Sequence, residues 1–261
     1  MLFEAEVFKV FMLVMMRISG LMVSAPVLGS ANFPARAKIG LAILIAMMVS
    51  PTIQQLNEPL PDALLTLGFM ATFEVAIGLL MGFFMTLVFA AVQVAGQVVD
   101  MLSGFALMNV FNPALETQVP IFGFFLYIVA ALYLLAIDGH HLMIRALVAS
   151  FETMPLGELT LRPEVLGEIS RWGSLMFADG LLIAAPVAGA LLLAYVTMGL
   201  MGRVVPQIHL FVVGFPFTIA LSLLMMGLFI GFYVDLLDEI FHRMFKGVST
   251  CLLYTSPSPR D

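Results

Sequence analysis

The chain has 261 residues, of which 62% are hydrophobic and 11% charged, and its net charge is −6. A negative net charge and scattered basic residues exclude a nucleic-acid partner, and the single cysteine, Cys251, excludes disulfides and thiolate metal sites. No Lys or Arg occurs in the 106 residues from Ile39 to Ile144, so this stretch cannot be ordinary solvated surface. The composition predicts a membrane protein, or a protein buried in other apolar protein.

Apolar runs predict an all-α fold built from long hydrophobic helix hairpins. The runs lie at 7–28, 39–56, 63–95, 120–137, 174–201 and 208–234. The first run is too long for a signal peptide and follows acidic residues, so it is expected to be a retained helix. We expect a single domain over residues 1–248, followed by a non-native or disordered tail over 249–261.

The run at 63–95 is longer than a bilayer requires. As a helix it would extend roughly 50 Å against a hydrocarbon core of about 30 Å, so it tilts, breaks or rises out of the membrane into protein. The chain also has 23 Phe and 20 Met but five Tyr and one Trp, which favours packed protein contacts over aromatic belts at lipid headgroups. General hydrophobicity alone is the other explanation of this composition.

Two pairs of glycines have the spacing of close helix-packing seams. Gly78 and Gly82 form one pair, and Gly227 and Gly231 form the other. Glu74 lies one turn before Gly78 on the same face, so it is expected to point at a neighbouring helix. It could be a proton relay or a packing carboxyl; the second is favoured, and it predicts that Glu74→Gln is nearly silent.

A polar stripe follows at the end of the same helix, with helical spacing between its members. It consists of Gln93, Gly96, Gln97, Asp100 and Gly104. The stripe predicts a face toward water, a lumen or a polar partner, and a solvated face is favoured over a pore lining.

The next segment is an apolar loop between Gly104 and Pro113. Its apolar side chains are Phe105, Leu107, Met108, Val110 and Phe111. Exposed loops are usually polar, so this one is either buried or occludes something. The residues alone favour burial.

Asp138, His140 and His141 are the only residues that suggest a metal ion. Adjacent histidines in a helix are expected to point about 100° apart, and no third ligand lies nearby in the sequence, so we expect no metal. No phosphate loop, nucleophile elbow or zinc-protease motif occurs. We therefore predict no catalytic residue, no cofactor and no enzymatic activity.

Several motifs together resemble the FliR family of flagellar type III export-gate components. The resemblance covers roughly residues 10–245 and is most specific near the C-terminus. In chain order the motifs contain Arg17, Pro26, Arg36, Lys38, Glu74, Gly78, Gly82, Pro120, Asp138, His140, Arg203, Pro206, Gln207, Phe211, Gly214, Phe215 and Pro216.

The resemblance implies a structural and gating subunit of the flagellar protein export channel, in the bacterial inner membrane at the flagellar basal body. The family fuses FliP-like and FliQ-like elements and assembles with FliP, FliQ, FlhB and FlhA around a pore that passes unfolded export substrates. Its apolar plug loop maps onto 105–113. The alternative is a secondary transporter that uses Glu74, Asp100 and Asp179 as intramembrane carboxylates. A passive membrane anchor is a further alternative, and it would not need the apolar loop.

Overall fold

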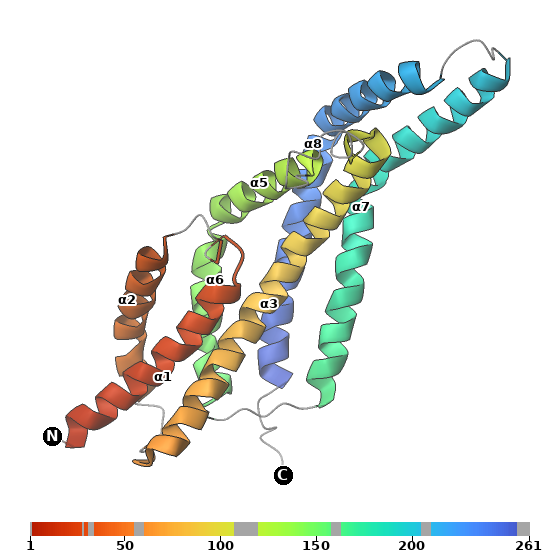
Figure 1. Cartoon of the computed structure of the whole chain (residues 1–261). Coiled ribbons are helices and arrows are strands. Elements are labelled where there is room, and N and C mark those ends of the chain that lie inside the picture. Colours follow the sequence, from red (N-terminus) through yellow and green to blue (C-terminus); the bar gives the residue numbers. More distant parts are fainter. Residues whose placement is uncertain are drawn as a thin grey trace. The chain divides into compact units, whose positions relative to one another are not determined.

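The computed structural model describes residues 2–27, 29–30, 34–54, 60–106, 120–157, 163–204 and 210–254 and is all-α over them (Figure 1). No strand occurs in these ranges, as the apolar runs predict. The helices are α1 (Leu2–Ser24), α2 (Ala35–Gln54), α3 (Leu64–Ser103), α5 (Ile121–Ala136), α6 (Gly139–Thr153), α7 (Pro163–Val204) and α8 (Leu210–Tyr254).

Three of the helices are longer than a bilayer needs. The over-long run at 63–95 forms α3, which has 40 residues and is one continuous helix in Figure 1. At 1.5 Å per residue α3 is roughly 60 Å long. α7 and α8 have 42 and 45 residues. The sequence does not predict α6 as a separate helix, because its two histidines, Arg145 and Glu152 interrupt the apolar pattern.

The chain forms two compact units, each assembled from segments far apart in the sequence. The first contains Met1–Leu87, Asp138–Trp172 and His242–Asp261, and the second contains Val88–Ile137 and Gly173–Phe241. α3 therefore contributes its first part to the first unit and its last part to the second. This leaves open our expectation of one export-gate domain over 1–248.

The core of the first unit is formed by α1, α2, the first part of α3, and α6. Its fully buried apolar side chains are mostly aliphatic or methionine residues, including Val14, Ile18, Ala46, Ile77, Met85 and Leu147. Trp172 packs edge-on against Phe84, with ring centroids 6.3 Å apart. The unit thus buries one apolar face of each helix, as expected for amphipathic packing.

The core of the second unit is more aromatic. Phe89 on α3 contacts Tyr127 on α5 and Phe241 on α8, with ring centroids 5.3 and 5.8 Å apart. The Tyr233 hydroxyl donates a hydrogen bond of 2.8 Å to the carbonyl of Leu126, which satisfies a polar group inside the core. Such tyrosines pack with their rings and anchor with their hydroxyls.

Five segments of the described chain are long and apolar enough to span a membrane. They are Ala5–Ser24, Ala35–Ile53, Leu64–Ser103, Gly167–Val204 and Val212–Gly247, and the broken pair α5–α6 makes a sixth if it counts as one span. In the apolar 18-residue window of each segment, 56% is buried within the chain for α3, but 28% for α7 and 22% for α8. α7 and α8 therefore leave many apolar side chains exposed, among them Leu193, Leu200 and Leu228.

Candidate functional site

The first notable polar group is an ion pair inside the first unit. Arg17 on α1 and Glu74 on α3 are both 0% exposed. The Arg17 Nε donates to Glu74 Oε2 at 2.6 Å, and Nη2 donates to Oε1 at 3.2 Å. This is the bidentate fork geometry in which a guanidinium binds a carboxylate most strongly.

The remaining contacts of this pair come from the end of α6. Arg17 Nη1 donates to the Ser150 hydroxyl and Nη2 to the Met154 carbonyl, both at 3.0 Å, and the guanidinium carbon lies 4.0 Å from the centroid of the Phe151 ring. A cation near the C-terminus of a helix also interacts favourably with the helix dipole. The Gly157 amide donates to Glu74 Oε1 at 2.8 Å. Arg17 thereby joins α1, α3 and α6.

The glycine seam beside Glu74 is filled by α1. A side chain on Gly78 would collide with the Arg17 carbonyl, and one on Gly82 would collide with the Ser24 hydroxyl. From the other side, a side chain on Gly20 would lie 2.5 Å from the carbonyl of Val75. The two backbones therefore approach closely, and this approach lets the short Glu74 side chain reach Arg17.

The second buried carboxylate on α3 belongs to the second unit and has a different set of partners. Asp100 is 3% exposed and accepts hydrogen bonds of 3.2 Å from the amides of Phe122 and Gly123. These amides are at the start of α5, where the first turn lacks acceptors within the helix. Asp100 therefore caps α5 from a neighbouring helix, and the Pro120 N-cap position itself supplies no side-chain bond.

The polar stripe predicted on α3 divides between two environments. Gly96 is buried, and a side chain there would collide with the backbone of Gly123, whereas Gln93 and Gln97 are exposed. The buried half of the stripe holds α5 against α3. The exposed side chains of Gln93 and Gln97 face the surroundings of the chain.

Just after Asp100, the end of α3 is held by side chains from α7 and α8. Tyr195 donates its hydroxyl to the Leu102 carbonyl at 2.6 Å, and Thr218 donates to the Ser103 carbonyl at 2.9 Å. The last carbonyls of a helix have no intrahelical donor, so these bonds satisfy groups that would otherwise need water. The apolar loop thus begins from an anchored helix end.

Gly104 connects this end to the loop with a φ of +92°, the left-handed region that favours glycine. The ring of Phe215 lies against it, and a side chain on Gly104 would lie 2.9 Å from the Phe215 Cε2 atom. Phe105 packs edge-on against Phe122, with centroids 5.6 Å apart. The Gly214–Phe215–Pro216 motif on α8 and the start of the loop therefore meet.

Several other predicted residues are either exposed or lie outside the described ranges. Leu107, Met108, Val110, Phe111, Pro206 and Gln207 lie outside the described residues. Arg203 is exposed in the last turn of α7, and Pro216 is exposed within α8. Nothing in the described chain lies within 4 Å of a side chain built on Gly227 or Gly231, so the second seam is open.

Sequence reasoning did not pair Arg17 with Glu74, and it missed Ser150, Tyr195 and Thr218. A signal for the pair was present: Arg17 is the only basic residue between Val10 and Ala35, and a charge inside an apolar run needs a counter-charge. Hydroxyl groups that bond distant carbonyls carry no comparable pattern, because any Ser, Thr or Tyr could do so.

The chain consists of apolar helices long enough to span a membrane, and buried polar groups hold them together. These features are those of an all-α membrane protein. Over residues 8–244 the chain matches the family described as "Bacterial export proteins, family 1", and it belongs to that family.

Its relatives include three proteins named flagellar biosynthetic protein FliR. The one from Bacillus subtilis is 33% identical over 85% of this chain and 86% of its own length. The one from Pectobacterium carotovorum is 31% identical over 93% of this chain and 92% of its own. The Escherichia coli protein is 29% identical over 89% and 88%, respectively.

Proposed function

We propose that this chain is a non-enzymatic structural and gating subunit of the flagellar type III protein export channel in the bacterial inner membrane. It forms the entrance pore with FliP and FliQ, contacts FlhB and FlhA, and passes unfolded flagellar export substrates. The observation that carries the proposal is the family match over residues 8–244, together with FliR relatives that align over almost their whole length.

Exposed apolar surface supports assembly with other subunits. On α7 and α8 the side chains of Leu193, Leu200 and Val212 are 71%, 62% and 68% exposed. Lipid can cover part of such a surface, but helices of 42 and 45 residues are longer than a bilayer. Apolar surface that extends beyond the hydrocarbon core needs protein to cover it.

The anchored end of α3 supports a gating role for the loop at 105–113. A plug that swings within a pore needs a fixed attachment, which the bonds from Tyr195 and Thr218 and the packing of Phe215 provide. Apolar side chains can dewet and seal a narrow bore, and methionine adapts its shape to its neighbours. We infer that the root of the plug stays in place when the channel opens.

The geometry does not favour the transporter alternative. Glu74 is engaged by Arg17 and a backbone amide, and Asp100 caps α5, so both carboxylates have structural roles. Pro186, which would have to interrupt a helix near the membrane centre, lies inside α7, with helical residues on both sides of it. Asp179 is 8% exposed and also has an interaction partner.

Replacing the apolar loop residues tests the proposal. Leu107, Met108, Val110 and Phe111 are changed together to serine, and both assembly with partner subunits and membrane leakage are measured. Because a packed seal depends on several side chains at once, we expect an assembled gate that leaks ions or small molecules, and little effect from single changes.

A matched control changes Asn109 and Asn112 in the same segment to serine, which preserves every apolar side chain. It should assemble and remain sealed. If the variant with four serine substitutions assembles normally and does not leak, then the loop is merely buried and the proposed gating role is wrong.

A further inference from the structure

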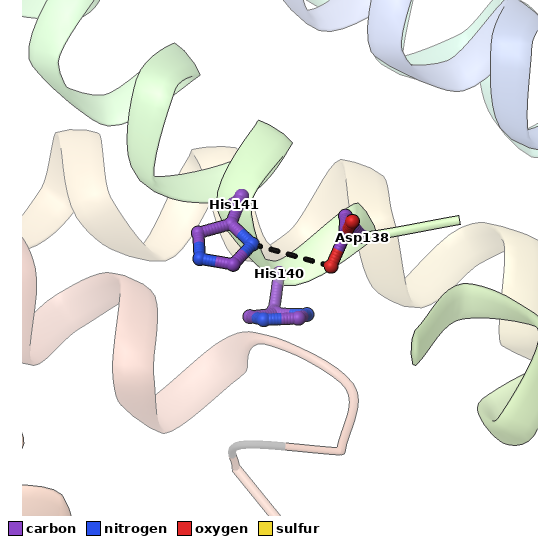
Figure 2. Close-up of side chains that lie close together, drawn as sticks. All are labelled: Asp138, His140 and His141. Carbon is purple, nitrogen blue, oxygen red and sulfur yellow. Dashed lines mark ion pairs between the residues drawn. The ribbon is translucent and has the colours of Figure 1, made fainter. Parts of the chain in front are cut away.

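We propose that Asp138, His140 and His141 form a binding site for a divalent transition-metal ion such as Zn²⁺. The site goes beyond the proposed export function and does not depend on it. One ligand atom from each residue lies within 4.8 Å of the other two, all within the first unit. Figure 2 shows the three side chains gathered at the start of α6.

The two imidazole rings lie closer together than the sequence predicts. Their centroids are 4.2 Å apart and the ring planes are tilted by 40°. The His141 Nδ1 lies 3.4 Å from Asp138 Oδ1. The 100° between neighbouring positions in a helix separates Cβ directions, but the side-chain torsions let both rings lean to the same side.

Two features show that His140 Nδ1 and the capping capacity of Asp138 are not used, although Asp138 does pair with His141 inside the cluster. The Nδ1 atom of His140 is buried and has no hydrogen-bond partner in the described part of the chain. Asp138 occupies the N-cap position of α6 with a φ of 55°, yet its carboxylate makes no capping hydrogen bond. A buried nitrogen without a partner is costly, and coordination to an ion would remove that cost.

The donor set defines the class of ion. Two imidazole nitrogens and one carboxylate oxygen suit Zn²⁺, Co²⁺, Ni²⁺ or Cu²⁺, whereas Ca²⁺ and Mg²⁺ prefer oxygen ligands only. The side chains of Asp138 and His141 are 74% and 62% exposed, so an ion can reach the site and keep water as a further ligand. The positive end of the α6 dipole opposes a cation and therefore weakens the binding.

The test uses the full chain purified with its assembly partners, without a histidine tag and after removal of metals by a chelator. Zn²⁺ is titrated and followed by calorimetry, and Co²⁺ is titrated and followed by its visible absorption. We expect this chain to bind one metal ion at saturation. The His141→Ala change should abolish this binding, and Asp138→Asn should weaken it about tenfold or more. X-ray absorption of the Zn²⁺ form should show two imidazole ligands.

His242→Gln is the matched control, because it removes a histidine that lies outside the cluster. It should retain the bound metal ion at unchanged affinity. Far-UV circular dichroism verifies that each variant is folded, and Asp138→Asn replaces His141→Ala as the deciding variant if the latter does not fold. The proposal is overturned if the wild-type chain binds no metal ion, or if the deciding variant binds it with unchanged affinity.

Discussion

The two parts of α3 each hold a neighbouring helix through a buried carboxylate and a close glycine contact, but the two carboxylates bind different groups. In the first unit, Glu74 and the Gly78/Gly82 seam pin α1, and the carboxylate binds a guanidinium. In the second unit, Asp100 and Gly96 pin α5, and the carboxylate binds two backbone amides. In both cases glycines let the backbones approach, and a buried acid makes directional bonds across the contact.

The difference lies in what each carboxylate would leave behind if it were lost. Removing Asp100 strands two neutral amides at a helix start, whereas separating Glu74 from Arg17 strands a full charge in a fully buried position. An uncompensated buried charge costs more than an unpaired amide. The comparison therefore predicts a graded series of effects along one helix.

The largest effect is expected from Arg17→Met, which leaves Glu74 buried without its counter-charge. We predict a loss of about 3–5 kcal/mol in the free energy of unfolding, measured by unfolding in mixed micelles with far-UV circular dichroism. Glu74→Gln should also destabilise, because it leaves the Arg17 charge opposite a neutral amide. The sequence predicts only that Glu74→Gln leaves function nearly intact, and the buried pair adds the expectation of a loss of stability.

The double variant Arg17→Met/Glu74→Gln sharpens this prediction. It removes both charges together, so most of the loss should be recovered. Arg145→Met, at an exposed position on α6, is the control and should change stability by less than about 0.5 kcal/mol. A double variant as unstable as the single one would show that the pair does not act as a unit.

The next effect concerns the two glycine seams. Gly78→Ala should destabilise by about 1–3 kcal/mol, because the new methyl group collides with the α1 backbone and over-packs the contact. Gly227→Ala meets nothing within 4 Å and should leave stability unchanged or slightly raised, since alanine favours helix. Thermal unfolding of both variants in the same detergent provides the measurement.

Bulkier variants of the same glycines separate folding from assembly. Gly82→Leu should disturb the chain itself, because α1 fills that seam. Gly227→Leu should leave the fold intact but reduce co-purification with partner subunits if the open seam packs against them. Equal co-purification for Gly227→Leu and wild type would remove that seam from the proposed interface.

The sequence predicts six of the seven described helices, because each of those six contains a long apolar run and such a pattern depends on local residues alone; α6 lacks such a run and is not predicted. The predictions fail at polar positions, because the role of a polar side chain depends on partners far away in the sequence. Glu74 and Gly78 predicted a seam, but not that Arg17 from the same chain fills it. Asp100 was placed on a polar stripe, whereas its role as a cap on α5 requires the packing of two helices that are about twenty residues apart.

A moderate effect is expected from Asp100→Ala. The amides of Phe122 and Gly123 lose their acceptor, so α5 should be destabilised by about 1–2 kcal/mol. Asp100→Asn retains one side-chain oxygen and should lose less. Hydrogen exchange should accelerate in the first turn of α5 and remain unchanged in α1. Exchange that accelerates equally in α1 and α5 would contradict a local capping role.

The smallest effect is expected at the exposed counterpart of the Arg17–Glu74 pair. Lys9 on α1 donates a hydrogen bond of 2.6 Å to Asp62, just before α3, but the Asp62 side chain is 95% exposed. The Lys9 ammonium holds the pKa of the Asp62 carboxyl below its ordinary value of 3.8. A carboxylate with a lowered folded-state pKa contributes stability above its unfolded pKa and loses it as the pH falls through the folded value.

Asp62→Asn should therefore lower the melting temperature only slightly at pH 7, because exposed pairs contribute little and salt screens them. The difference between wild type and variant should shrink below pH 3.8 and vanish once the pH has passed the lowered pKa of Asp62. Melting curves of both proteins across this range, at low and high salt, provide the measurement. A difference that grows toward acid pH, or that survives high salt unchanged, would mean that Asp62 acts through something other than its charge. In that case exposure would not explain why this pair and the buried Arg17–Glu74 pair differ.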